Sequence, residues 1–307
     1  MNNQFPKAAV LLSTYNGERF LQEQIESILK QKEVSVDVLV RDDGSKDSTT
    51  EILQGFGDKV RLLKGNNVGV GNSFMNVLYE AGTEYEYYAF SDQDDIWLED
   101  KLARAIGMIG SSETPVLYCS NQMLVDGEGS EIGLRHQTAP GTGWMQILNN
   151  NYLSGCTMVW NKALQTALAD PARKPSEAMM KKRIHDVWVG MTASVTGRII
   201  YDPEARIQYR QHENNVVGVR HESVLKTWKK KINDPELRNG RSMLAEEISR
   251  KFSDLIPDQT IRDKLKVYGD SRTHWKARLK TLFDPDLSRY SGEPRWQLMI
   301  KIIAGLF

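Results

Sequence analysis

The sequence predicts an α/β fold in which helices flank a largely parallel sheet, followed by a mainly helical C-terminal region. Over the first 110 residues, short continuous apolar runs alternate with segments whose apolar residues have helical spacing. The connections between the apolar runs are long enough for parallel pairing. The pattern becomes irregular from residue 116, and the composition changes again near residue 221.

Four strands are expected in the first part, at residues 8–12, 36–40, 60–63 and 85–90, with helices at 20–29, 49–55, 73–81 and 99–109. Each strand is followed by polar residues, which are Thr14-Tyr15-Asn16, Asp42-Asp43, Asn66-Asn67 and Asp92 with Asp94. Ligands of open α/β sheets bind outside the carboxyl ends of the strands. The sequence therefore predicts a nucleotide site along this edge. The glycines at 65, 69 and 71 match no phosphate-loop pattern and equally suit a mobile loop.

Later strands are expected at residues 116–119, 122–125, 154–160 and 197–202, and later helices at 144–149, 162–170, 241–255 and 258–268. Another helix is expected to begin near Asp186, with His185 beside it. A carboxylate is favourable at a helix start, so Asp186 is either structural or a general base. The polar stretch 208–218 suits a loop that closes over phosphate, and equally an ordinary polar surface.

The stretch Ser91–Trp97 joins the fourth strand to the next helix and holds Asp92, Asp94 and Asp95. Three carboxylates so close together repel one another unless a cation lies between them. Mg²⁺ or Mn²⁺ prefers oxygen ligands and often binds one or two carboxylates together with substrate phosphates. The alternative is a solvated acidic turn that caps the next helix.

The 40 Lys and Arg residues balance the 40 Asp and Glu residues, so overall charge gives no argument for nucleic-acid binding. Residues 1–220 carry 22 basic against 28 acidic residues, whereas residues 221–307 carry 18 against 12. Two cysteines give no disulfide framework, and no apolar stretch reaches the length of a membrane span. We therefore expect a cytoplasmic protein with a basic C-terminal extension.

Three segments in order resemble the family-2 inverting glycosyltransferases of the GT-A fold: Leu12–Gly17, Asp42–Thr49 and Asp92–Asp95. His185–Trp188, Tyr209–His212 and Asn215–Gly218 are similar to the rhamnosyltransferase branch of that family. The resemblance implies a Rossmann-like mixed sheet flanked by helices. It also implies a nucleotide-sugar-binding and catalytic domain over residues 1–220, with residues 221–307 as a helical, basic and amphipathic extension.

The resemblance assigns roles to single residues. Nucleotide binding falls to Thr14, Tyr15, Asn16, Glu18, Asp43, Asp92 and Arg210. In this scheme Asp43 hydrogen-bonds the pyrimidine, Asp94 and His212 bind Mn²⁺ or Mg²⁺, and Asp186 is the catalytic base. The additional acid Asp95 leaves open which carboxylate is the main metal ligand.

The implied reaction is inverting transfer of a sugar, with L-rhamnose from dTDP-L-rhamnose as the leading donor. The implied acceptor is a hydroxyl of a lipid-linked cell-surface polysaccharide, as in O-antigen, capsule or cell wall biogenesis. A UDP-hexose donor is the alternative within the same fold. A glycoside hydrolase would leave the strand-end clusters unexplained, and a nucleotidyltransferase would need a triphosphate loop that residues 13–19 lack. An inactive scaffold subunit is the alternative of another class.

The C-terminal residues 296–307 are strongly apolar, and a helix there would place Trp296, Met299, Ile303 and Phe307 on one face. Such a face can dock on the body, form a homodimer, or lie in a membrane interface. With the basic and aromatic segment Lys226–Lys231, it predicts peripheral association with the inner face of the cytoplasmic membrane.

Overall fold

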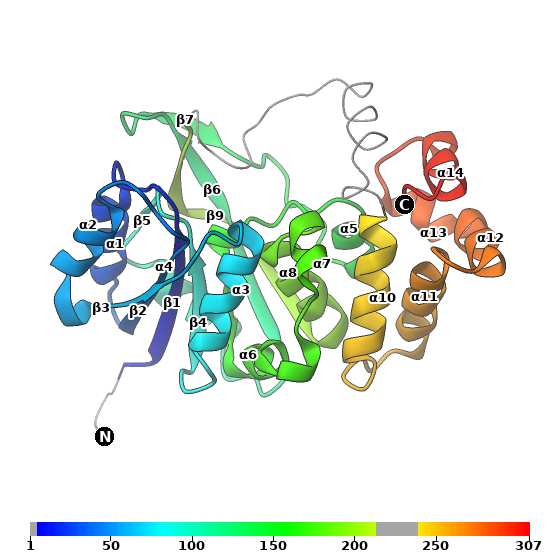
Figure 1. Ribbon diagram of the computed structural model, residues 1–307, viewed down its shortest axis with the longest axis horizontal. Helices are drawn as coiled ribbons and strands as arrows, with labels where there is room; N and C mark the ends of the chain where they lie inside the picture. The colour runs from blue at the N-terminus through cyan, green and yellow to red at the C-terminus, as the bar shows by residue number, and fades with distance from the viewer. Residues whose placement is uncertain (1–4, 213–238) are drawn as a thin grey trace. The chain divides into compact units, whose positions relative to one another are not determined.

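The computed structural model describes residues 5–212 and 239–307, which form two compact units (Figure 1). The first unit comprises the residues up to 140, residues 153–170 and the stretch from 198 to the end of the described part. The second comprises residues 141–152, 171–197 and the C-terminal residues. This division differs from the functional boundary expected between residues 220 and 221, because the helices in 141–152 and 171–197 pack against the C-terminal helix α10 (Gly240–Phe252). The segments Asn215–Gly218 and Lys226–Lys231 lie outside the described residues.

The first unit contains a mixed sheet of nine strands among the described residues, in the order β3-β2-β1-β4-β8-β6-β9-β5, with β7 added to β6. The strands are β1 (Lys7–Thr14), β2 (Ser35–Asp42), β3 (Val60–Lys64), β4 (Tyr87–Ser91), β5 (Ile96–Trp97), β6 (Val116–Val125), β7 (Glu131–Leu134), β8 (Val159–Asn161) and β9 (Arg198–Arg210). Strands β3, β2, β1 and β4 are parallel, whereas β8 runs antiparallel to its two neighbours. The predicted α/β fold with a mixed sheet is confirmed.

Helices cover both faces of the parallel strands because these strands are apolar on both sides. On one face, Ala8, Val10 and Leu12 of β1 share a core cluster with residues of α1 (Leu21–Leu29) and α4 (Lys101–Ile109). On the other face, α3 (Val70–Glu80) contacts β1 and β2, and its Phe74 packs edge-on against Phe90 of β4 at 5.0 Å. The helices α2 (Thr49–Gly55) and α6 (Lys162–Ala169) complete the unit.

The strand register brings the polar strand ends together. Thr14 pairs with Asp42, Asp42 pairs with Lys64, and Leu12 pairs with Ser91. The four parallel strands therefore end at nearly the same level, and the loops that follow them leave from one edge of the sheet. This is the edge at which the sequence predicts a ligand site.

Three predicted elements differ from the observed ones. Strand β6 runs unbroken through the polar pair Ser120-Asn121, which is buried, and its pairing with β9 is irregular there. The strand expected at 154–160 is a short 3₁₀ turn, Gly155–Thr157, followed by β8. The polar stretch from Gln208 is not a loop at its start, because β9 continues to Arg210.

The second unit is helical. It contains α5 (Trp144–Asn149), α7 (Glu177–Lys182), α8 (His185–Thr196), α10, α11 (Gln259–Asp270), α12 (Trp275–Phe283), α13 (Pro285–Tyr290) and α14 (Arg295–Ile303). The buried Trp188 of α8 packs edge-on against Phe252 of α10 at 5.7 Å. Among the helices of the described residues, none is both long enough and apolar enough to cross a bilayer.

Candidate active site

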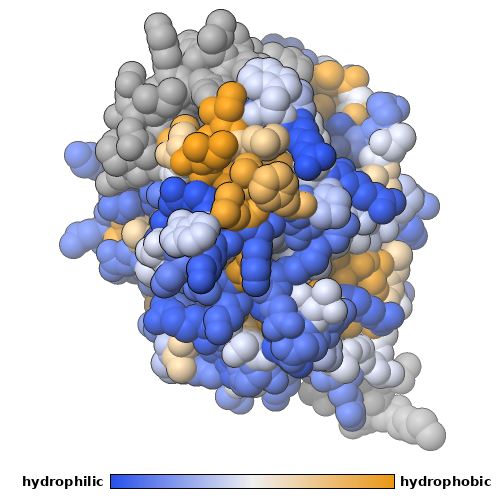
Figure 2. Space-filling model, turned by 90° about the vertical axis from the view of Figure 1, so that its right-hand side faces the viewer, coloured by the Kyte–Doolittle hydropathy of each residue, from blue (hydrophilic) through white to orange (hydrophobic). Residues whose placement is uncertain are grey.

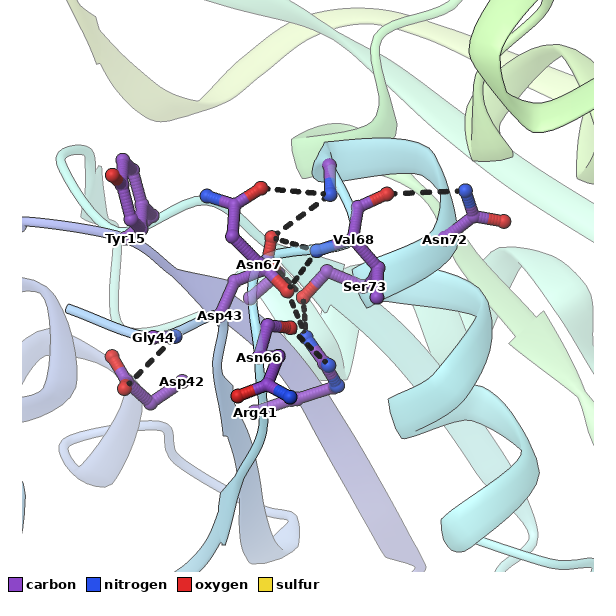
Figure 3. Close-up of polar contacts among 12 residues, drawn as sticks. Tyr15, Arg41, Asp42, Asp43, Gly44, Asn66, Asn67, Val68, Asn72 and Ser73 are labelled. Atoms are coloured by element: carbon purple, nitrogen blue, oxygen red, sulfur yellow. Dashed lines mark hydrogen bonds and ion pairs between the residues drawn. The ribbon is translucent and has the colours of Figure 1, made fainter. Parts of the chain in front are cut away.

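The loop after β2 is fixed by a buried ion pair between Arg41 and Asp43 (Figure 3). The guanidinium of Arg41 also donates to Ser73 Oγ at 2.9 Å and to the Asn66 carbonyl at 3.1 Å. The Asp43 carboxylate accepts the backbone N–H of Val68, at 3.0 Å from Oδ1. One arginine and one carboxylate therefore connect the β2–α2 loop with the β3–α3 loop.

Close backbone contact between these two loops requires glycine at position 44. Gly44 has φ +84°, in the left-handed region, and a Cβ there would lie 3.3 Å from the backbone nitrogen of Asn67. The Asp42 carboxylate accepts the N–H groups of Gly44 and Ser45 at 3.2 and 3.1 Å. Asp42 therefore shapes the turn, while Asp43 faces the β3–α3 loop.

Asn16 and Glu18, which are predicted to line the nucleoside site, join the β1–α1 loop to the β2–α2 loop. Asn16 Oδ1 accepts the N–H of Lys46 at 2.9 Å, and Glu18 Oε2 accepts the N–H of Ser48 at 2.9 Å. In return, Asp47 accepts the N–H of Glu18 at 3.1 Å. Both predicted side chains therefore have a structural contact at this edge of the sheet.

Gln93, in the middle of the acidic turn, holds the end of β1. Its Oε1 accepts from Thr14 Oγ1 at 2.6 Å and from the N–H of Tyr15 at 2.9 Å. Thr14 is buried and Tyr15 is exposed. Gln93 is not among the residues predicted from the sequence, because its partners Thr14 and Tyr15 lie 79 and 78 residues earlier in the chain.

The acidic turn is placed by β5, which pairs with β9 so that Ile96 lies opposite Gln208. This pairing brings the turn against the end of β9. Asp95 is buried and accepts the N–H of Arg210 at 3.2 Å, while Asp94 Oδ2 lies 2.9 Å from His212 Nε2. The structure therefore brings the two predicted metal ligands, Asp94 and His212, into direct contact.

Burial and the neighbouring charges of Asp94 and Asp92 raise the pKa of Asp95 well above its ordinary value. Burial also raises the pKa of Asp94, and the hydrogen bond and charge of His212 oppose that shift. The two adjacent carboxylates are thus held differently. Asp95 bonds to backbone within the fold, and Asp94 faces an imidazole.

Two groups of donor atoms at this turn are close enough for a metal ion. Asp94 offers a carboxylate oxygen, which suits Mn²⁺ or Mg²⁺ when substrate phosphates complete the shell, and His212 places an imidazole nitrogen 2.9 Å from it, which suits Mn²⁺ better than Mg²⁺. Atoms of Asp92, Asp95 and Cys156 lie within 4.8 Å of one another. Cys156 is a poor ligand for Mg²⁺, because thiolate is a soft donor and burial raises the pKa of this thiol well above its ordinary value. The donor chemistry therefore fits Asp94 and His212 better.

Phe20, immediately before α1, contacts both Arg210 and His212 at the end of β9. The guanidinium carbon of Arg210 lies 4.2 Å from the centre of the Phe20 ring, and the ring of His212 lies 5.2 Å from it. Arg210 also donates to Glu23 Oε2 at 2.7 Å. The helical spacing of the sequence places Phe20 among the core residues, and only the long-range position of β9 reveals its actual partners.

Asp186 belongs to the second unit, in the first turn of α8. Its Oδ1 accepts the N–H of Val187 at 2.6 Å, and its Oδ2 accepts from Asn151 Nδ2 at 3.3 Å. Burial lowers the pKa of the neighbouring His185 to about 3, so that imidazole is neutral at pH 7. Of this pair, only the partly exposed carboxylate of Asp186 is available for proton transfer near neutral pH.

Comparison with known proteins was consistent across sequence and structure. The sequence model described as Glycosyl transferase family 2 matches residues 9–165. The chain is 31% identical over 215 residues to a dTDP-rhamnosyl transferase, RfbG, of Shigella flexneri, covering 67% of this chain and 73% of that protein. It is 23% identical over 175 residues to the putative glycosyltransferase EpsH of Bacillus subtilis, covering 55% of this chain and 49% of that one.

Among solved structures, S. aureus TarS residues 1–349 in complex with UDP gives a TM-score of 0.60 at 17% identity, covering 97% of this chain and 87% of that chain. The complex of the same protein with UDP-GlcNAc gives 0.57 at 20% identity, covering 97% and 88%. Identity at this level shows a shared fold, which is the predicted GT-A fold. Together with the match to the family model, it leads to one conclusion: the chain is a member of glycosyl transferase family 2.

Proposed function

We propose that the protein is an inverting glycosyltransferase that transfers L-rhamnose from dTDP-L-rhamnose to a hydroxyl of a lipid-linked cell-surface polysaccharide. The observation that carries this proposal is the pairing of Asp94 with His212 beside Arg210, at the sheet edge where the four parallel strands end. The negative charge that develops on a leaving diphosphate is stabilised by a metal ion and by fixed positive charge. The rhamnosyl donor is supported by the 31% identity to RfbG.

In this proposal each predicted residue has a defined task in donor binding. Asp43, oriented by Arg41, accepts the N3–H of the pyrimidine. The Asp43 N–H donates to the Thr14 carbonyl, and the next residue, Tyr15, is exposed for contact with the base. Thr14, Asn16, Glu18 and Asp92 shape the nucleoside and ribose site, the first three through the loop contacts described above. Asp94 and His212 would hold Mn²⁺ or Mg²⁺, which would supply Lewis acidity to the leaving diphosphate.

The chemical step is a single displacement at the anomeric carbon. The acceptor oxygen forms the new glycosidic bond as the bond to the diphosphate oxygen breaks, and the acceptor proton passes to the Asp186 carboxylate. Arg210 supplies positive charge to the departing nucleoside diphosphate. Attack from the opposite face inverts the anomeric centre, so a β-L-rhamnosyl donor gives an α-linked product.

Thermal-shift measurements with thymidine and uridine diphosphates and their sugars, with and without Mn²⁺, test the donor assignment. A ligand that binds the native state raises its stability by mass action. We expect a metal-dependent shift with the thymidine nucleotides that disappears in Asp94→Ala. Asp58→Ala, which removes an exposed acid at a distant turn, should retain it. No shift with any nucleotide would favour the inactive scaffold.

A uridine nucleotide sugar is the second candidate donor. It is favoured by the TarS structures, whose ligands are UDP and UDP-GlcNAc, although the shared identity there is only 17–20%. A metal-dependent shift with uridine diphosphate and none with thymidine diphosphate would select it. The mechanism assigned to Asp94 and Asp186 would stay the same.

A lipid-linked acceptor would place the enzyme at the inner face of the cytoplasmic membrane as a peripheral protein. The basic balance of residues 221–307 supports this location, since anionic lipid attracts Lys and Arg. A homodimer through the same residues is the competing arrangement. Fractionation of cells into membrane and soluble pools, with and without a high-salt wash, tests the location.

A further inference from the structure

Two neighbouring helices of the second unit, α12 and α14, expose large apolar side chains on a common face (Figure 2). These side chains recur at helical spacing along each helix and are between 43% and 67% exposed. They are Trp275, Leu279 and Phe283 of α12 and Trp296, Ile300 and Ile303 of α14. Of the four residues predicted to share a face, Trp296 and Ile303 are exposed and Met299 is half-buried, whereas Phe307 is buried against Tyr268. Helix α14 itself packs through the buried Leu298 and Ile302.

Helices α12 and α14 also carry buried residues, which are different from the exposed apolar ones. Thr281 of α12 is fully buried, and its hydroxyl donates to the Ala277 carbonyl one turn earlier in the same helix. On α14, Lys301 pairs with Glu293, which also accepts from the buried Arg241 at 2.8 Å. Substitution of the exposed apolar side chains therefore removes surface without removing the contacts that position the helices.

The charge on the two helices has one sign. The two helices contain no acidic residue. They contain five basic residues, which are Lys276, Arg278, Lys280, Arg295 and Lys301. Of the nearest acids along the chain, Asp284 and Asp286 pair with Lys264. Glu293 pairs with Arg241 and with Lys301, so the charge of Lys301 is matched within the unit. Lys276, Lys280 and Arg295 are exposed beside the apolar side chains.

We propose that α12 and α14 form a docking face for the surface of an anionic bilayer. Tryptophan and phenylalanine lie at the depth of the headgroups, the aliphatic side chains enter the acyl boundary, and the flanking lysines and arginine contact anionic headgroups. A second copy of this chain fits less well. In a two-fold symmetric dimer the face would meet itself, which places like charges opposite one another.

This inference rests on the proposed function for its purpose, because a face that binds the bilayer brings the enzyme to a lipid-linked acceptor. Its test does not depend on transfer, since vesicle binding is measured without donor, acceptor or metal. If vesicle binding fails while a soluble acceptor is still glycosylated, the docking face is wrong and the proposed activity stands. If the protein binds vesicles but no nucleotide, the docking face stands and the proposed activity is wrong.

The full chain should be sedimented with vesicles of phosphatidylcholine alone and with vesicles of equal parts phosphatidylcholine and phosphatidylglycerol. We expect binding to the anionic vesicles that weakens with salt. Lys276→Gln with Lys280→Gln should weaken this binding about 25-fold, at about fivefold for each lost charge. Lys162→Gln, at an exposed lysine of the first unit, is the matched control and should change nothing.

The apolar part is tested by Phe283→Ser with Ile303→Ser, which should weaken binding at least about tenfold. Ile132→Ser, at a comparably exposed residue of β7, is its control. Unchanged vesicle binding in both double variants would overturn the proposal. So would a concentration-dependent dimer in analytical ultracentrifugation that the apolar double variant dissolves while its vesicle binding persists, since that face would then belong to a second copy.

Discussion

The buried pair of Arg41 and Asp43 allows the strongest test of how the fold builds the nucleotide edge. Arg41→Met keeps most of the side-chain volume and removes the guanidinium, so that a buried carboxylate loses its cationic partner. Breaking a buried pair from one side typically costs 3–5 kcal/mol. Asp43 retains N–H donors from Val68 and Gly69, at 3.0 Å for Gly69, so the lower end applies. We expect a loss of about 3 kcal/mol in the free energy of unfolding.

Urea unfolding measures this loss directly, and thermal unfolding should show a midpoint about 6 °C lower for a chain of this size. Asp43→Asn and the double variant complete a mutant cycle whose coupling energy isolates the pair. Arg41→Lys is the charge-matched control. It should recover only part of the loss, because lysine cannot donate at once to Asp43, Ser73 and the Asn66 carbonyl.

Donor binding distinguishes a structural from a functional role of the same pair. If Arg41 orients Asp43 toward a pyrimidine, Arg41→Met should weaken thymidine diphosphate binding in a folded sample well below its melting temperature. Equal stability of Arg41→Met and the wild type, with no coupling in the cycle, would refute the reasoning. It would mean that Asp43 is held by the β3–α3 loop alone.

Three further results are expected. Asp202 is fully buried and bound by the half-exposed Arg104, so Asp202→Asn should lose about 2 kcal/mol of unfolding free energy at pH 7. Burial raises the pKa of Asp202, but its hydrogen bonds, first that from Arg104, lower the pKa by more, so the folded-state pKa lies below the ordinary value. The wild-type advantage is therefore full above pH ~4 and should vanish in urea titrations as the pH falls through the folded-state pKa. Asp186→Asn should abolish transfer in a product assay while calorimetry finds donor binding intact, and unchanged turnover would remove the residue from the mechanism. Gln93→Ala should cost about 1–2 kcal/mol of stability in the same unfolding assay, because it removes the acceptor of Thr14, and Gln22→Ala, at an exposed glutamine of α1, is the control.

The sequence was sufficient to predict the parallel half of the sheet and its polar edge. Residues 8–12 and 36–40 are continuous apolar runs followed by polar clusters, and a parallel arrangement puts those clusters on one edge whatever the exact register. The observed pairing of Thr14 with Asp42 agrees with this pattern, which by itself leaves the exact register open. Local composition was enough because each strand is buried on both faces.

The second half of the sheet could not be predicted in the same way, since its strands are defined by partners rather than by composition. Strand β9 contains Arg206, Gln208 and Arg210, and a local pattern with so many polar residues resembles a loop. It is a strand because β6 pairs with it along nearly its whole length. Asn121 shows the same effect within β6, where its buried side chain bonds to the backbone of His136 at 2.8 Å.

The position of β9 also explains how adjacent acids acquire different tasks. Strand β5 pairs with β9 two residues before Arg210, so the acidic turn lies against the end of β9. There the turn can contact both the backbone and the side chains of β9. Asp95 takes the backbone N–H of Arg210, which fixes the turn, and the side chain of Arg210 is thereby left to Phe20 and Glu23. Asp94, one residue earlier, meets His212 instead. The end of one strand thus determines the positions of a carboxylate, an imidazole and a guanidinium. The choice of Asp94 as the proposed metal ligand therefore depends more on the pairing of β5 with β9 than on the spacing of the acids.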